Sequence, residues 1–416
     1  MLQADFLIRN AREILTCAGP GPLAGSRQAQ VTAVANASLA AMDGVIVFVG
    51  PAAEADAQVT LRPDAVVIDA ADHAVVPGFV DAHTHSVFAG DRRAELRRRL
   101  AGATYAEIAA AGGGIVSTVT ATREATQEEL VNQSRPRLDE MLASGTTTCE
   151  IKSGYGLDVE SELRMLRAIA ALATQHTIDV IPTFMGAHEV PQEYRGRRDD
   201  YVDLVIREML PAVAAEQLAA WCDVFCETGV FSPDDSLRIL EAGIEHGLKP
   251  RIHADELAAS GGSRIAAQVG ARSADHLIFV PDEGIAAMAA SGVVATLLPN
   301  AAFYLKLGRF APARKLIEAG VPVALATDVN PGGGFSPSMP FAIALACFGM
   351  NMTFEEALVA ATFNGAWSLD VSDKVGSLEP GKLADAVIVR GEAINLIRMG
   401  APSIAAVVKR GRVVGR

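Results

Sequence analysis

The sequence is short of cysteine and of positive charge. Its 416 residues include only five cysteines, which are scattered and odd in number: Cys17, Cys149, Cys222, Cys226 and Cys347. So few cysteines exclude a fold held together by disulfides and favour reduced thiols in a cytoplasmic protein. Lysine and arginine total 36 against 49 aspartate and glutamate residues, which gives a net charge of −13. Because phosphate backbones attract basic surfaces, this balance argues against nucleic acid as a partner.

A long apolar run is also lacking. The stretches 284–305 and 329–354 carry no charge, but Pro299 interrupts the first, and the second opens with proline, glycine and serine residues. Neither offers the ~20 consecutive apolar residues that a membrane-spanning helix needs. The N-terminus carries Asp5 and Arg9 where a secretory signal would have its apolar core. We therefore predict a cytoplasmic protein that does not enter a membrane.

Strand-like runs alternate with helical patterns through the middle of the chain. Continuous runs of valine, isoleucine, alanine and leucine predict eight buried strands, at residues 74–80, 145–151, 178–184, 221–226, 250–253, 271–275, 293–298 and 321–327. Two capping-box pairs, Thr126 with Glu129 and Thr353 with Glu356, predict helix starts. This order is typical of an α/β fold, a (β/α)8 TIM-like barrel, with residues 86–144 inserted after the first strand. A doubly wound sheet is the alternative.

The two ends of the chain have a different pattern. Short strand-like segments divided by turn residues fill residues 1–70, and residues 372–416 repeat this pattern, with a turn at Arg410 and Gly411. We predict that both ends together form one small β-sandwich domain, residues 1–70 plus 372–416. The barrel domain then spans residues 71–371.

Polar residues gather where the predicted barrel strands end. In parallel barrels these carboxyl ends surround one pocket, and function resides there. Five of the eight histidines lie at such positions: His83, His85, His188, His253 and His276. His83 and His85 are two residues apart, so on a strand both imidazoles point to the same side and can bind one metal ion. His253 and Asp328, which end the fifth and eighth strands, are the candidates for further ligands.

Three residues near these strand ends suit acid–base catalysis. Asp328 is placed to receive a proton from a water molecule beside the metal, and Glu256 is placed to protonate a leaving nitrogen. His276 follows the neighbouring strand and is placed to polarise the substrate. The alternative for His276 and Glu256 is a supporting or surface position.

Arginines are dense after the first strand. Arg92 is nearest to the predicted mouth of the barrel, where a guanidinium group suits a substrate carboxylate. Arg97, Arg98 and Arg99 follow within the same segment. We expect these three on the solvated face of a helix, paired with nearby acidic residues.

Several motifs in the chain are similar to those of the amidohydrolase superfamily. They lie at residues 77–85 (PGFVDAHTH), 253–256 (HADE), 326–328 (ATD) and 376–385 (GSLEPGKLAD). Within the superfamily, the resemblance narrows to the imidazolonepropionase family of histidine degradation. The narrower resemblance rests on residues 88–92 (FAGDR), 111–115 (AGGGI), 150–157 (EIKSGYGL), 186–188 (GAH) and 328–332 (DVNPG).

The resemblance implies a reaction and a cofactor. The reaction is hydrolysis of 4-imidazolone-5-propanoate to N-formimidoyl-L-glutamate. The cofactor is one Zn or Fe ion per subunit, bound by His83, His85, His253 and Asp328. Relatives with two metal ions use a carboxylated lysine at the end of strand four, where this chain has Glu227, so one ion is expected. A homodimer is also implied.

The resemblance further implies which residues bind the anionic small-molecule substrate. They are Arg92, Tyr155, His188, Asn330 and Gly332. Relatives often carry a hydroxyl or thiol residue next, where this chain has Gly333 and Gly334. A contact from the Gly333 backbone would survive that change, whereas a side-chain contact would not.

Two other functions remain open at this stage. The same metal site would also serve a deaminase that acts on a purine or pyrimidine-like ring. Arg92 and Tyr155 argue against this, because a neutral base needs no group that binds a carboxylate. A catalytically inactive scaffold would require lost ligands, and all four predicted ligands are present.

Overall fold

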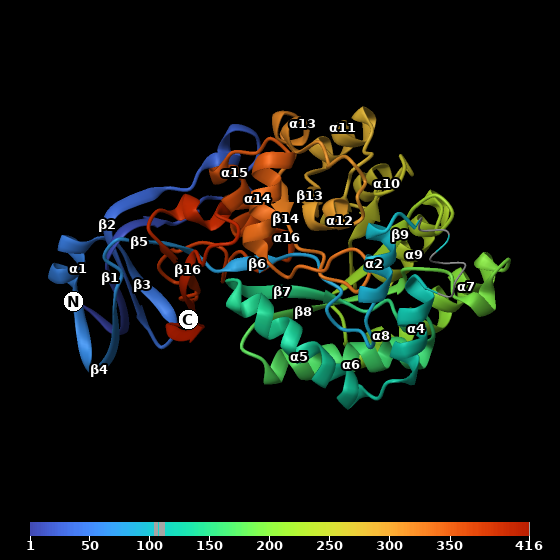
Figure 1. The fold of residues 1–416 in the computed structure, drawn as a ribbon, viewed down its shortest axis with the longest axis horizontal. Coiled ribbons are helices and arrows are strands. Elements are labelled where there is room, and N and C mark those ends of the chain that lie inside the picture. Colours follow the sequence, from blue (N-terminus) through green and yellow to red (C-terminus); the bar gives the residue numbers. More distant parts are fainter. Residues whose placement is uncertain (104–106, 108–112, 416) are drawn as a thin grey trace.

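The middle of the chain folds into a barrel of parallel strands, in a computed structural model that describes residues 1–103, 107 and 113–415 (Figure 1). Residues 111 and 112 of the AGGGI motif therefore lie outside the described residues. The barrel strands pair in chain order, and every pair is parallel. They are β6 (Phe79–Asp81), β7 (Thr146–Lys152), β8 (Asp179–Ala187), β9 (Trp221–Cys226), β11 (Ile252–Ala254), β12 (Ser273–His276), β13 (Val294–Leu297) and β14 (Val323–Leu325), with the short β10 (Lys249–Pro250) beside β9.

The barrel closes just beyond the ends of its first and last strands. The backbone amide of Asp328 donates to the carbonyl of His83 at 3.1 Å, and the amide of His85 donates to the carbonyl of Val329 at 2.9 Å. These bonds join the segments that follow β6 and β14. Closure therefore brings together two segments that carry predicted metal ligands.

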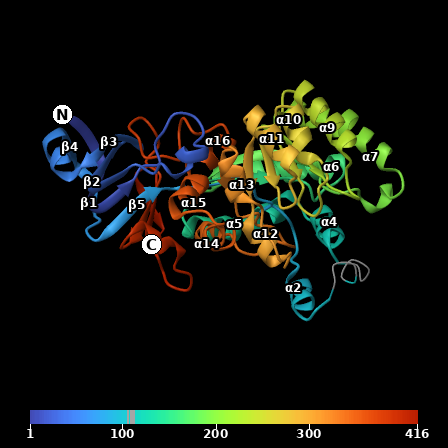
Figure 2. The same ribbon diagram turned by 90° about the horizontal axis from the view of Figure 1, so that it is seen from above.

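Helices surround the barrel and connect its strands (Figure 2). Both predicted capping boxes are present, since Thr126 accepts from the Glu129 amide and Thr353 from the Glu356 amide, each at 3.2 Å. Every helix among the described residues is too short or too polar to cross a membrane. The helices are α2 (Arg93–Leu100), α4 (Ile115–Glu124), α5 (Gln127–Ala143), α6 (Val159–Gln175), η2 (Gln192–Tyr194), α7 (Arg198–Leu204), η3 (Val205–Met209), α8 (Leu210–Glu216), α9 (Pro233–Glu245), α10 (Gly262–Gln268), α11 (Asp282–Ser291), α12 (Pro299–Tyr304), α13 (Ala313–Glu318), α14 (Met339–Gly349), α15 (Phe354–Ala361) and α16 (Phe363–Ser368).

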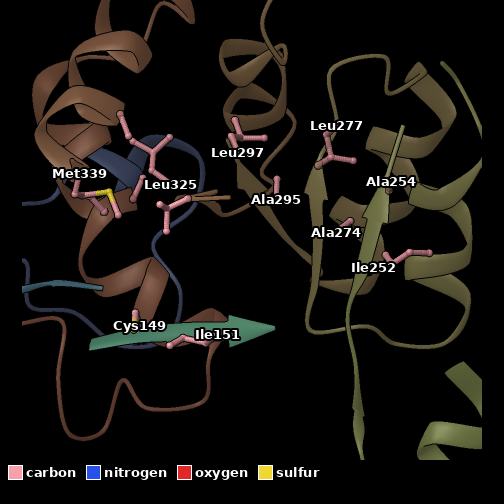
Figure 3. Packing of buried hydrophobic residues seen from close by; sticks show 14 of the residues in the cluster. Cys149, Ile151, Ile252, Ala254, Ala274, Leu277, Ala295, Leu297, Leu325 and Met339 are labelled. Carbon is pink, nitrogen blue, oxygen red and sulfur yellow. The ribbon is translucent and has the colours of Figure 1, made fainter. Parts of the chain in front are cut away.

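One apolar cluster fills the space between the strands and the surrounding helices. It contains Ile151 of β7, Ile252 of β11 and Leu297 of β13, all fully buried. Figure 3 shows members of this cluster on several strands and on α14, including Met339. Because both faces of a barrel strand are covered, the strands consist of the continuous apolar runs that predicted them.

The two ends of the chain form a second sheet beside the barrel, at the end of the molecule that carries both termini (Figure 1). The sheet has its own apolar cluster, which includes Phe6, Ile8, Leu39 and Val408. The predicted fold class, a TIM-like barrel with a small β unit built from both termini, is confirmed. The domain boundaries given above remain a prediction. The elements are β1 (Leu2–Leu15), η1 (Gly25–Ala29), β2 (Ala33–Met42), β3 (Val45–Pro51), α1 (Ala52–Gln58), β4 (Val59–Asp69), β5 (His73–Pro77), β15 (Ala386–Arg390), η4 (Ala393–Ile397), β16 (Ile404–Lys409) and β17 (Arg412–Gly415).

The first predicted barrel strand, at residues 74–80, is two strands in the structure. β5 pairs with β1 and β15 in the terminal sheet, and only β6 belongs to the barrel. The chain passes from one sheet to the other at Gly78, where a Cβ atom would lie 2.3 Å from the Thr147 hydroxyl oxygen. Only glycine permits this close approach. Because the run of apolar residues continues through Gly78, the sequence pattern does not show where the first strand ends and the second begins.

Candidate functional site

A cavity of about 670 Å³ opens at the carboxyl ends of the barrel strands. Its lining contains the residues that the sequence predicted for the site, with the exception of His83, which is fully buried beneath it. The predicted residues in the lining are His85, Arg92, Tyr155, His188, His253, Glu256, His276, Asp328, Asn330, Gly332 and Gly333. These eleven residues come from several segments that are far apart in the sequence and meet at one opening.

The four candidate metal ligands converge at the floor of this cavity. His83 Nε2 and His85 Nε2 lie 3.6 Å and 3.7 Å from Asp328 Oδ1, and His253 Nε2 lies 3.3 Å from His85 Nε2. Among the described residues, His83 Nε2 is buried without a hydrogen-bond partner. A buried polar atom without a partner is costly unless it binds a ligand. His83, His85 and Asp328 each offer a ligand atom close enough to the others to hold one metal ion, and His83 forms a second such group with His253 and His276.

Burial adjusts the protonation of these ligands. It lowers the pKa values of His83 and His85 well below the usual range, so both rings are neutral, which is the form that binds a metal. Burial and the nearby Glu256 raise the pKa of Asp328 well above its usual range. A neighbouring cation opposes that shift and favours the ionised carboxylate.

Five charged side chains lie beneath the ligands and are fully buried. This charged floor consists of Glu150, Lys152, Asp223, Arg251 and Asp275. Lys152 Nζ lies 2.6 Å from Glu150 Oε1 and 2.7 Å from Asp223 Oδ2, and Arg251 Nη2 lies 3.4 Å from Asp275 Oδ2. Burial alone would lower the pKa of Lys152, but Asp223 and Glu150 outweigh it and raise that pKa. Lys152 is therefore a charged partner for both acids.

The charged floor orients two of the candidate ligands. Asp275 Oδ2 lies 2.7 Å from His83 Nδ1, and Asp223 Oδ1 lies 3.0 Å from His253 Nδ1. An ionised carboxylate only accepts hydrogen bonds, so each Nδ1 donates and each Nε2 keeps a lone pair for a metal ion. The sequence pattern gave no reason to select Asp223, which lies inside β9 rather than at its end.

Glu256 and His276 lie together at the edge of the candidate ion site. Glu256 Oε1 is 3.5 Å from His276 Nδ1. Burial, with Glu227 nearby, raises the pKa of Glu256 to about 8, and burial lowers the pKa of His276 well below its usual range. At neutral pH the pair therefore consists of a protonated carboxyl and a neutral imidazole. His276 and Asp328 have φ angles of 74° and 52°, a backbone region that is uncommon for residues other than glycine.

The loop after β14 forms one wall of the cavity. Asn330 Oδ1 accepts from the amides of Gly332 and Gly333 at 2.8 Å and 2.6 Å, so this side chain shapes the loop. On the opposite side of the ion site, His188 stacks on His85 with ring centres 4.8 Å apart and donates from Nδ1 to the Gly154 carbonyl. The predicted substrate-binding residues thus lie around the candidate ligands on several sides.

Comparison with known proteins places the chain in a family. Residues 74–414 match the model of the amidohydrolase family. The imidazolonepropionase of Symbiobacterium thermophilum is 52% identical, over 100% of this chain and 98% of that protein. The imidazolonepropionase of Clostridium tetani is 45% identical over 100% and 99%, and that of Geobacillus kaustophilus is 48% identical over 98% and 97%. The chain belongs to the imidazolonepropionase family of amidohydrolases.

Solved structures with this fold are more distant in sequence. A zinc-bound adenosine deaminase from Xanthomonas campestris is 20% identical with a TM-score of 0.70, over 99% of this chain and 93% of that chain. A triazine hydrolase variant is 19% identical with a TM-score of 0.75, over 98% and 94%. At these identities the likeness concerns the fold alone. The prediction of a hydrolase of the imidazolonepropionase family is confirmed by the closer relatives.

One arginine of this imidazolonepropionase family member lies in the cavity although we expected it on a solvated face. Arg99 lines the cavity and donates to the carbonyls of Tyr304 and Gly332, both at 3.1 Å, whereas Arg97 and Arg98 are exposed as predicted. Arg99 follows Arg92, the residue just before α2, by seven residues, a spacing of about two helical turns. This spacing was the available signal, and the density of arginines obscured it. We call Arg92, Glu95 and Arg99 the arginine wall.

Proposed function

We propose that this protein hydrolyses 4-imidazolone-5-propanoate to N-formimidoyl-L-glutamate, as a step of histidine degradation. The observation that carries the proposal is that three candidate metal ligands line one cavity together with Arg92 and Arg99, while the fourth ligand, His83, lies directly beneath it. The substrate has the matching parts, a cyclic amide to be cleaved and an anionic tail to be held. The imidazolonepropionase relatives, similar over nearly their full lengths, support the same reaction.

One Zn or Fe ion per subunit is proposed, with His83, His85, His253 and Asp328 as its ligands. When bound, the ion would supply the Lewis acidity that makes water nucleophilic near neutral pH. The neutral imidazoles of His83 and His85 and the buried Asp328 carboxylate have the chemistry for this role. This ligand set suits both zinc and iron.

Three residues are proposed to move or hold protons. Asp328 accepts the proton of the attacking water. His276 donates a hydrogen bond to the amide oxygen, on which negative charge develops as water adds to the carbonyl carbon. Glu256 then gives its proton to the ring nitrogen as the carbon–nitrogen bond breaks, and its pKa of about 8 keeps it protonated for this step at neutral pH.

The substrate is proposed to lie with its propanoate tail against Arg92. A carboxylate gains about 1.5–3 kcal/mol from a hydrogen bond to a charged donor. Tyr155, His188, Asn330, Gly332 and the backbone of Gly333 would then contact the ring and the tail from the remaining sides of the cavity. We further propose a cytoplasmic homodimer that does not bind nucleic acid.

An assay with the purified, metal-loaded protein tests this function. The ultraviolet absorption of imidazolone propanoate is followed over time, and N-formimidoyl-L-glutamate is quantified as the product. We expect loss of the absorption band with equimolar product. Ammonia release from purine or pyrimidine bases, without turnover of imidazolone propanoate, would point to a deaminase instead. No turnover of either substrate by protein with one ion per subunit would contradict the proposal.

A further inference from the structure

Glu95 is a buried carboxylate that joins two parts of the cavity wall. It lies on the inward face of α2, and its side chain is 11% exposed. Its Oε2 accepts from Arg92 Nε at 2.8 Å, and its Oε1 accepts from the Gly114 amide, immediately before α4, at 2.9 Å. Both carboxylate oxygens therefore have partners, and these partners lie on opposite sides of residues 100–113 in the chain.

The bond to Glu95 determines which part of Arg92 remains available. Guanidinium has five donors in a fixed plane, so binding Nε to one acid sets the direction of Nη1 and Nη2. In the part of the chain that the structure describes, the Arg92 guanidinium forms no other hydrogen bond, and Arg92 lines the cavity. The outer edge of the group is therefore the one that a substrate carboxylate would meet.

A second contact fixes the guanidinium from the other side. A Cβ atom on Gly332 would lie 2.3 Å from Arg92 Nη1 and 2.7 Å from its central carbon, so the guanidinium rests directly on the Gly332 backbone. Gly332 belongs to the loop that begins at Asp328, a candidate metal ligand. Glu95 on one side and Gly332 on the other therefore define the position of Arg92 relative to the candidate ion site.

We propose that Glu95 is a positioning residue that directs the outer edge of Arg92 toward the carboxylate of the substrate. This inference rests on the proposed function. Because the Arg92–Glu95 pair is buried, solvent screens it little, and the geometry it imposes is not averaged as in an exposed pair. Glu95 does not touch the substrate itself. Its effect is expected only on substrates that carry the anionic tail.

The first experiment compares two substrates with Glu95→Gln. Glutamine keeps the size of the side chain and an oxygen for the Gly114 amide, but places an amide group where Arg92 needs an acceptor. We expect KM for imidazolone propanoate to rise about tenfold, because one charge-assisted hydrogen bond is lost. The value of kcat should stay within about twofold of the wild-type value. With the methyl ester of the substrate, which lacks the negative charge, KM should not change. A similar loss with both substrates would overturn the proposal, because a purely structural defect does not distinguish them.

A double-mutant cycle isolates the pathway through Arg92. If Glu95 acts only through Arg92, then E95Q in an Arg92→Ala background should cause no further rise in KM. Additive effects would overturn the proposal. Asp91→Asn is the matched control, because Asp91 belongs to the same segment but pairs with the exposed Arg93. This variant should behave as wild type.

The outcomes separate the inference from the function on which it rests. If R92A leaves KM unchanged, the placement of the substrate carboxylate is wrong. If R92A raises KM and E95Q does not, only the role of Glu95 is wrong. Should E95Q unfold, as judged by circular dichroism, Glu95→Asp replaces it in the cycle, because aspartate keeps the charge on a shorter side chain. E95D should then raise KM for the charged substrate alone, and an equal rise with the ester would overturn the proposal.

Discussion

The charged floor lies buried beneath the candidate ligands, whereas both arginines of the arginine wall line the cavity, and the two regions are built differently. The floor consists of side chains from barrel strands and the residues beside them, all with 0% exposure, and its acids and bases contact one another directly. The wall belongs to an inserted helix, and its arginines are held by one acid and by backbone carbonyls. Under the proposed function, the metal-dependent chemistry would lie on the rigid barrel and recognition of the substrate carboxylate on the insertion.

The charged floor and the arginine wall also differ in how their buried charges are compensated. In the floor, removal of either partner leaves an uncompensated buried charge, which costs several kcal/mol. In the wall, Arg92 is paired with Glu95 yet keeps donors for an incoming anion. We expect floor substitutions to change metal binding, proton transfer or stability, and wall substitutions to change substrate binding alone.

The largest expected effect comes from removing a candidate ligand held by the floor. His253→Ala removes an imidazole that Asp223 orients at 3.0 Å. We expect metal content to fall from one ion per subunit to near zero, and activity with it, as measured by elemental analysis and the absorption assay. His246→Ala, which changes an exposed histidine, should keep its ion. A stoichiometric ion retained by H253A would show that the ligand set is wrong.

The next largest effect concerns the proposed proton donor, Glu256, which lines the cavity beside His276. Glu256→Gln should lower kcat about 10²- to 10⁴-fold, the usual contribution of a general acid. Because the pKa of Glu256 is raised to about 8, the group is protonated below that pH and loses its proton above it. The wild-type rate should therefore fall as pH rises through about 8, and E256Q should lack this limb.

A change at Glu227 provides the control for that pH dependence. Its negative charge contributes to the raised pKa of Glu256 after burial itself. Glu227→Gln should therefore move the limb to lower pH while kcat on the acidic plateau stays close to the wild-type value. If the pH at which the rate falls does not change in E227Q, a group other than Glu256 causes the pH dependence.

Two lysines test the cost of breaking an ion pair in the floor. Lys152→Met leaves Glu150 and Asp223 buried without their shared cation, and should lower the free energy of unfolding by about 3–5 kcal/mol. Lys249→Met breaks a pair with Asp370 at the surface, where the lysine side chain is 57% exposed, and should cost about 0–1 kcal/mol. Denaturant unfolding of the metal-stripped proteins measures both. Equal losses would mean that burial does not set the difference between the two sites.

The sequence predicted the candidate metal ligands, though not the charged floor beneath them, because a barrel brings the ends of its strands together. His83, His85, His253 and Asp328 were identified from their positions at predicted strand ends, and the helix starts at Thr126 and Thr353 followed from local capping patterns. These features depend on spacing along the chain. They can be recognised without knowledge of which distant side chains become neighbours.

The features that the sequence did not predict depend on contacts between distant segments. The chain passes from the terminal sheet to the barrel at Gly78 because the Thr147 side chain packs against it. The orientation of His253 depends on Asp223, thirty residues away. Arg99 enters the cavity because carbonyls of Tyr304 and Gly332 accept its hydrogen bonds. The contacts at Gly78 and His253 leave no local pattern, and the spacing from Arg92 to Arg99 was obscured by the neighbouring arginines, so Arg92 was the only residue of the arginine wall that the sequence identified.

The smallest expected effect comes from the wall. Arg92→Ala removes the proposed partner of the substrate carboxylate and should raise KM about 10- to 100-fold, since one or two charge-assisted hydrogen bonds are lost. Metal content should remain at the wild-type value because Arg92 contacts Glu95 and the Gly332 backbone, and none of the candidate ligands. Arg93→Ala, whose side chain is 76% exposed, is the matched control and should leave KM unchanged. If R92A lost its ion together with its affinity for substrate, the wall and the floor would have to be regarded as one coupled unit.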